Sequence, residues 1–153
     1  MLSLSLQHQK DEINEYTRKL GYFFPNLQRK LLGAIATKIF GSVKKSLKKK
    51  VKSRTGGLAS GLFKKNYATY SRVTFNGKQI GKANALESGT HILPKKRKVL
   101  TFKIDGRILR AKEVRVLPRK FFQEGTDNFI NSPEMKKTLD KTVSDLIKKE
   151  NLA

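Results

Sequence analysis

The residues best suited to chemistry in this chain form a run of cations between positions 44 and 54. Seven of these eleven residues are basic: Lys44, Lys45, Lys48, Lys49, Lys50, Lys52 and Arg54. Clustered cations attract polyanions such as the DNA backbone and promote fast, salt-sensitive association. The run therefore predicts contact with DNA or with an acidic protein partner. The alternative is a solvated helix end that keeps the chain soluble.

The basic character extends well beyond this run. The 153-residue chain carries 34 Lys and Arg against 12 Asp and Glu, a net charge of +22. No acid occurs between Glu15 and Glu87, a stretch that holds 17 basic residues. Glu87 is therefore a lone carboxylate in a positive field, and two roles are open for it: an ordinary turn carboxylate or one half of an ion pair at a subunit interface.

Catalytic chemistry has little basis in the sequence. The chain has no Cys, which excludes disulfides and Cys-based zinc or iron–sulfur sites. Its carboxylates are scattered, His8 and His91 have no ligand-like neighbours, and neither a nucleophile elbow nor a phosphate-binding loop pattern is present. We therefore expect no enzyme activity, no cofactor and no metal site.

The N-terminal residues predict a cytoplasmic rather than an exported product. They contain neither the basic nor the apolar segment of a signal peptide. No run of apolar residues is long enough to cross a bilayer, so no membrane partner is expected. The low apolar content, 37%, favours a protein that completes its burial in an oligomer.

The periodicity predicts a single α+β domain over residues 1–153. Residues 1–24 are expected to form an N-terminal helical arm that ends at Gly21, before Pro25. Residues 25–54 are expected to form a long basic helix, with apolar residues at a spacing of four from Leu27 to Val51. Residues 55–131 are the expected β-rich core, and residues 132–153 the C-terminal helix.

The β-rich core is expected to hold an antiparallel sheet of about four strands, packed by the long helix and by the C-terminal helix. Asn76-Gly77 and Asp105-Gly106 are dipeptides typical of two-residue hairpin turns. Ser132-Pro133 predicts the start of the last helix, with Ser132 as its N-cap. The alternating residues around Phe102 should share a core with the apolar face of that helix. The expected core set is Leu100, Phe102, Ile104, Leu139, Val143 and Leu146.

Three short motifs separate these elements. The first, Thr55-Gly56-Gly57-Leu58, predicts a sharp turn after the long helix. In the second, residues 84–90, Gly89 permits a positive φ and Thr90 can cap the turn. In the third, residues 117–122, Pro118 stops a strand, and the Arg119 guanidinium can donate two parallel hydrogen bonds to one anionic partner. Its Phe121 and the following phenylalanine are expected either to pack in the core or to contact a subunit.

The order and spacing of these motifs resemble the tail-completion or neck protein family of long-tailed bacteriophages, also called the virion-morphogenesis or minor tail protein family. Its members show a Thr-Gly-x-Leu element, a Tyr-Ala-x-x-x-Glu-x-Gly-Thr element, a strand hairpin, a Pro-x-Arg-Pro-Phe element and a terminal helix. The resemblance covers about residues 35–150. The chain departs from the pattern at Asn84, where the family has Tyr, and at Lys120, where it has Pro.

The resemblance implies a structural virion protein that forms a ring, often hexameric, between the head connector and the tail tube or its terminator. It implies assembly in the host cytoplasm, residence in the virion neck and non-specific contact with genomic DNA. The motif residues expected at interfaces are Thr55, Gly56, Leu58, Glu87, Gly89, Thr90, Pro118, Arg119 and Phe121. The alternative is a stand-alone basic nucleic-acid-binding protein, which the charge and the aromatic–basic segment 63–67 favour.

Overall fold

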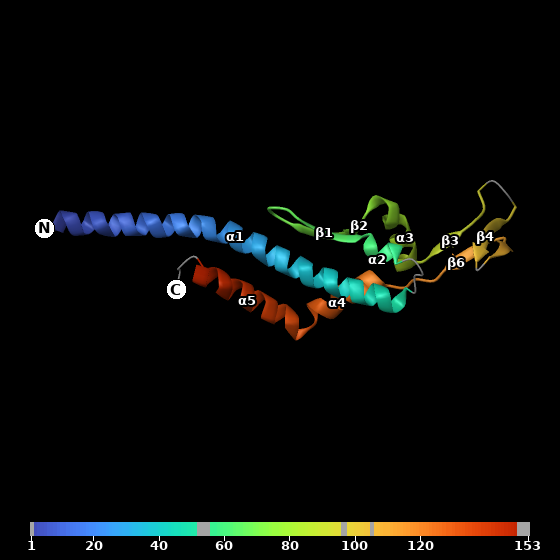
Figure 1. The fold of residues 1–153 in the computed structure, drawn as a ribbon. Helices are drawn as coiled ribbons and strands as arrows, with labels where there is room; N and C mark the ends of the chain where they lie inside the picture. The colour runs from blue at the N-terminus through green and yellow to red at the C-terminus, as the bar shows by residue number, and fades with distance from the viewer. Residues whose placement is uncertain (1, 52–55, 96–97, 105, 150–153) are drawn as a thin grey trace. The chain divides into compact units, whose positions relative to one another are not determined.

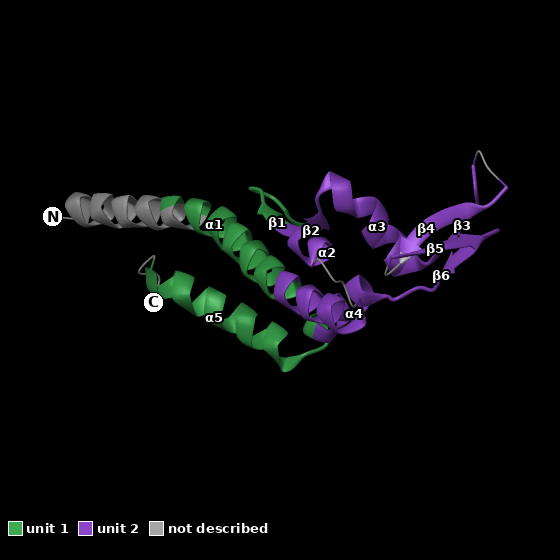
Figure 2. Cartoon of the chain, turned by 45° about the vertical axis from the view of Figure 1, so that its right-hand side comes forward, with its two compact units in different colours: residues 1–39, 64–73, 129–153 green, residues 40–63, 74–128 purple. Residues whose placement is uncertain are grey.

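The computed structural model describes residues 2–51, 56–95, 98–104 and 106–149. The chain is α+β, with a long helix in its N-terminal half, short antiparallel strand pairs and a C-terminal helix, which confirms the predicted class (Figure 1). Its residues group into two compact units. Residues 1–39, 64–73 and 129–153 make the first unit, and residues 40–63 and 74–128 make the second (Figure 2).

Helix α1 spans Leu2–Lys50 without interruption, so the predicted break between Gly21 and Pro25 is wrong. Pro costs about 3 kcal/mol and Gly about 1 kcal/mol inside a helix, and packing can offset both. Phe23, which lies between them, is 9% exposed. The helix ends at Lys50, within the predicted range of 25–54, and the Val51 N–H still donates to the Leu47 carbonyl at 2.8 Å.

The strands of the described residues form three two-stranded ladders rather than one sheet. Strand β1 (Leu62–Asn66) pairs with β2 (Ser71–Phe75). Strand β3 (Thr90–Ile92) pairs antiparallel with β6 (Val114–Val116). Strand β4 (Leu100–Ile104) pairs antiparallel with β5 (Arg107–Ala111).

The predicted hairpin at Asn76-Gly77 is wrong, because these residues start a helix. Helix α3 spans Gly77–Ser88, the segment that would have formed the second strand of such a hairpin. Asn76 is its N-cap, with the side-chain Oδ1 accepting a hydrogen bond from the Gln79 N–H at 3.0 Å. Asn suits both a hairpin turn and a helix N-cap, so the dipeptide alone could not distinguish the two.

The second predicted hairpin is confirmed. Leu100 lies opposite Ala111 and Ile104 opposite Arg107, which leaves a two-residue turn. Gly106 in that turn has a φ of 81°, a conformation that favours glycine. Its neighbour, residue 105, lies outside the described residues. A short helix, α2 (Gly57–Ser60), follows the long one.

The C-terminal part contains two helices where one was predicted. Helix α4 (Phe121–Ile130) lies inside the expected β-rich core, and α5 (Pro133–Lys149) confirms the predicted helix with Pro133 as its first residue. The Ser132 hydroxyl does not cap α5 as expected. It donates instead to the Phe129 carbonyl at 2.7 Å, which links the end of α4 to the turn.

Each unit has its own small set of buried apolar residues. The second unit buries Val43, Leu47, Leu58, Leu62, Phe75, Ala83 and Phe121, and the first buries Phe23, Ala36, Phe129 and Leu146. The predicted core of Leu100, Phe102, Ile104, Leu139, Val143 and Leu146 is formed in neither unit, since β4 belongs to the second unit and α5 to the first. Phe102 is only half-buried, because its two-stranded ladder is not part of a larger sheet.

Candidate functional site

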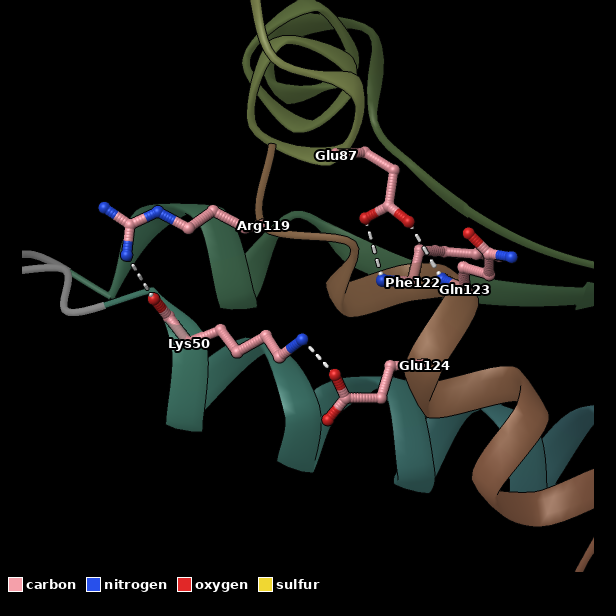
Figure 3. Close-up of polar contacts among 6 residues, drawn as sticks. All are labelled: Lys50, Glu87, Arg119, Phe122, Gln123 and Glu124. Carbon is pink, nitrogen blue, oxygen red and sulfur yellow. Dashed lines mark hydrogen bonds and ion pairs between the residues drawn. The ribbon is translucent and has the colours of Figure 1, made fainter. Parts of the chain in front are cut away.

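Two of the three motifs converge in the second unit, at a place that we call the motif junction. It consists of the end of α3 with Glu87, the segment 117–124, and Lys50 at the end of α1 (Figure 3). The backbone already joins two of these parts. The Arg119 N–H donates to the Leu86 carbonyl at 2.7 Å, and the Lys120 N–H donates to the Glu87 carbonyl at 3.3 Å.

Glu87 is a distant N-cap of helix α4. Its carboxylate accepts a hydrogen bond from the Phe122 N–H at 2.8 Å and another from the Gln123 N–H at 2.9 Å (Figure 3). The first N–H groups of a helix have no partner within the helix, and the helix dipole favours a negative charge there. The structure therefore gives this acid an intramolecular role that neither expectation named. It holds the start of one helix to the end of another.

Contacts of Arg119 and Lys50 link the end of α1 to the other parts of the motif junction. One guanidinium nitrogen of Arg119, Nη1, donates to the Lys50 carbonyl at 3.1 Å. That carbonyl is at the C-terminal end of a helix, where carbonyls lack intrahelical donors. The Lys50 ammonium makes an ion pair with Glu124 of α4 (Figure 3). The junction thus connects α1, α3 and α4 through polar contacts at their ends.

The backbone of the motifs explains why particular residue types stand there. Gly89 has a φ of 75°, as predicted, and a Cβ at this position would lie 2.8 Å from the Val116 carbonyl oxygen and 3.0 Å from Pro118 Cδ. Lys120 has a φ of 45°. A proline ring locks φ near about −65°, so the family's Pro does not fit the conformation that this chain adopts.

The remaining members of the first two motifs have local roles. Gly56, with a φ of 62°, is the N-cap of α2, and Leu58 in that helix is buried. Thr90 begins strand β3 opposite Val116. Thr55 lies outside the described residues.

Phe121 is a core residue of the second unit. Its side chain is completely buried, and its ring meets that of Phe75 edge to face, with centroids 6.0 Å apart. Of the two roles expected for this residue, the structure supports core packing. The first turn of α4 is thereby held both by the buried Phe121 ring and by the Glu87 carboxylate.

Of the five described residues of the basic run, Lys44 and Lys50 are half-buried and the other three are exposed. Lys45, Lys48 and Lys49 are exposed, at a spacing that places them on one face of α1. The Lys44 ammonium lies 5.6 Å from the centroid of the Phe40 ring. Lys50 is paired with Glu124, and Lys52 and Arg54 lie outside the described residues.

One polar cluster escaped sequence reasoning. His91 lies 2.7 Å from a Glu113 carboxylate oxygen, and Arg115 lies 3.4 Å from the other oxygen of the same carboxylate. The pairing of β3 with β6 places His91 opposite Arg115. Sequence alone could not relate His91 to the other two residues without the strand register, because His91 is 22 positions from Glu113. Within the described part of the chain, no group of three or more His, Cys, Asp or Glu could hold a metal ion.

We expect Glu87→Ala to lower the free energy of unfolding by about 2 kcal/mol, since hydrogen bonds to a charged group are worth about 1.5–3 kcal/mol. Glu87→Gln retains an acceptor oxygen and should cost roughly half as much. Urea denaturation of both variants, compared with the exposed-site control Glu134→Ala, provides the measurement. Equal stability of the Glu87→Ala and Glu134→Ala variants would contradict the capping role.

The contacts of the motif junction hold helix ends together. Its carboxylate accepts hydrogen bonds from two backbone N–H groups, and one nitrogen of its guanidinium donates to a backbone carbonyl. Within the described residues, no helix has the length and apolar character needed to cross a membrane. In comparisons with protein-family models, curated proteins and solved structures, nothing matches this chain.

Proposed function

We propose that the chain is a structural virion protein that joins the head connector to the tail in a tailed phage, as a tail-completion or neck ring, and that it is not an enzyme. The observation that carries the proposal is the convergence of two separated motifs. Glu87, Gly89, Arg119 and Phe121 form one junction although they are up to 34 positions apart. A family whose motifs maintain one scaffold would place its shared residues in such a junction.

Exposed apolar side chains support an oligomeric role. In the second unit, Leu117 is 76% exposed and Ile108 is 68% exposed, and Ile92, Leu93 and Leu109 are also exposed. A contiguous patch of such groups is typical of protein interaction sites, and these five residues lie between positions 92 and 117. We propose that neighbouring subunits of a ring, hexameric by the family resemblance, cover these side chains. The connector and the tail-tube or terminator proteins would contact the two faces of the ring.

The exposed lysine face of α1 supplies the charge for a second kind of contact. In a ring, each subunit would contribute this face, with Lys45, Lys48 and Lys49, to a belt of positive charge. Such a belt needs counter-charge from DNA in the channel or from an acidic neighbouring ring. Net charge also supports the alternative, a stand-alone nucleic-acid-binding protein. The two functions differ in where the chain is found, which makes them separable.

Interrupting the gene with a nonsense codon, in the phage genome that carries it, tests the proposal. We expect electron microscopy of the lysate to show filled heads and complete tails that are not joined, and expression of the wild-type chain in trans to restore joined particles. Quantitative mass spectrometry of purified virions should find the chain at the copy number of one ring. Normal particles without the chain would contradict the proposal and favour the stand-alone alternative.

A further inference from the structure

A cavity in the first unit is lined by two cationic side chains, an asparagine, a tyrosine and two small residues. It has a volume of about 410 Å³ and is lined by Arg29, Lys30, Gly33, Asn66, Tyr67 and Ala68. The first three residues lie on α1, and the other three lie at the end of β1 and in the turn that follows it. Every one of these residues belongs to the first unit. We call this cavity the hairpin pocket.

The charge of the hairpin pocket is entirely positive. Arg29 and Lys30 are exposed, and neither takes part in an ion pair among the described residues. Lys65, on the adjoining strand, extends the positive charge, and its ammonium lies 5.1 Å from the centroid of the Tyr67 ring. A site with two cations that have no ion-pair partner among the described residues, and with no carboxylate in its lining, favours an anionic ligand.

The turn that forms one wall of the pocket is held in place by its own contacts. The Tyr67 N–H donates to the Tyr70 carbonyl at 2.8 Å, and the two rings stack with centroids 4.4 Å apart and planes 19° apart. Asn66 adds an exposed side-chain amide, which can donate hydrogen bonds to an anion. The wall therefore offers polar donors on a preorganised support, which lowers the entropic cost of binding.

Gly33 keeps the pocket open. A Cβ at this position would lie 3.3 Å from Nδ2 of Asn66, closer than most contacts of a real side chain. Gly in the interior of a helix costs about 1 kcal/mol relative to Ala. This glycine lets the turn approach α1 while leaving space between them. A larger side chain here would fill the pocket without changing its charge.

We propose that the hairpin pocket binds the phosphate backbone of duplex DNA without sequence preference. Phosphate oxygens accept hydrogen bonds from Arg, Lys and side-chain amides, and such contacts position a protein on a duplex without reading its bases. Single-stranded nucleic acid is usually bound by aromatic rings that stack on its unpaired bases. Here the two tyrosine rings stack on each other instead, which favours contact with the backbone of a duplex. This site is distinct from the lysine face of α1, and the proposal does not rest on the proposed virion function.

The test measures binding of the full-length chain to a short mixed-sequence duplex by fluorescence anisotropy, over a range of salt concentrations. Gly33→Leu fills the pocket without changing its charge, and its matched control is Gly21→Leu, on the same helix with no neighbouring atom within 4 Å. The paired substitution Arg29→Gln with Lys30→Gln removes the two cations. Its charge-matched control is Lys136→Gln with Lys149→Gln, at exposed positions of α5.

Loss of two phosphate contacts should weaken duplex binding roughly 10- to 100-fold near 0.1 M salt and reduce the salt slope by about two. We expect the Arg29/Lys30 variant to show this loss. Gly33→Leu should weaken binding by roughly tenfold, because the filled pocket keeps phosphates away from both cations. Both control variants should bind within about threefold of the wild-type chain.

Three outcomes would overturn the proposal. If the two charge variants weaken binding equally, net charge and not the pocket attracts the DNA. If Gly33→Leu binds as the wild-type chain does, the pocket is not the contact. The same measurement is made with a single DNA strand of equal length. If Gly33→Leu weakens binding to the single strand but not to the duplex, the pocket binds unpaired nucleic acid. Circular dichroism of each variant verifies that the helices remain folded.

Discussion

Replacing Phe121 with alanine is expected to lower the free energy of unfolding by about 3–5 kcal/mol, the cost of truncating a buried phenylalanine. The side chain is completely buried, and its ring packs edge to face on Phe75. The second unit has only a small set of buried apolar residues to share the loss. The cavity left behind would also remove support from the first turn of α4, where the Glu87 carboxylate is bound.

Urea denaturation followed by circular dichroism provides the measurement. Phe63→Ala is the matched control, because it removes the same atoms from the same unit at a position that is 40% exposed. We expect the control to cost less than about 1–2 kcal/mol, the range of most substitutions outside a core. Similar losses for the two variants would show that Phe121 is not the central core residue of the unit.

Replacing Gly125 with alanine should cost about 1–3 kcal/mol or more, the usual penalty for overpacking. A Cβ at position 125 would lie 2.6 Å from the Cα and 2.9 Å from the N of Val43. These are backbone atoms of α1, so no change of rotamer can relieve the clash. Helices α1 and α4 would have to move apart, which would open the contact around Val43, whose side chain is completely buried.

Gly41→Ala is the control for this prediction, since no atom lies within 4 Å of a Cβ built at that helical position of the same unit. Alanine is favoured over glycine inside a helix by about 1 kcal/mol, so the control should be stabilised. The two identical substitutions are thus expected to act in opposite directions. Stabilisation by Gly125→Ala would show that the two helices do not approach closely at this point.

Local signals in the sequence were reliable where one short segment determined the structure. The spacing of four in α1 and the Ser132-Pro133 start both identified helices, and Asp105-Gly106 identified a hairpin. These signals depend on residues within one turn of each other, and neighbouring residues interact in the same way in many folds. The α+β class followed from their order along the chain.

Signals with two meanings were resolved only by packing. Asn76-Gly77 suits a hairpin and a helix start, and the chain uses it as the latter. Pro25 weakens a helix without forbidding it, and α1 continues through it. In each case the competing local conformations differ by a few kcal/mol, a difference that burial of neighbouring side chains can reverse.

The sequence by itself determined the charge of this protein, its motifs and the residue types available for binding. Only the tertiary structure decided what those residues contact. Glu87 could not be identified as the cap of α4 from its surroundings, since its partners are 35 and 36 positions away. The hairpin pocket likewise joins Arg29 to Asn66, which no local pattern relates. Contacts between distant segments depend on how the whole chain packs, because closing long loops is compensated only when many such contacts form together.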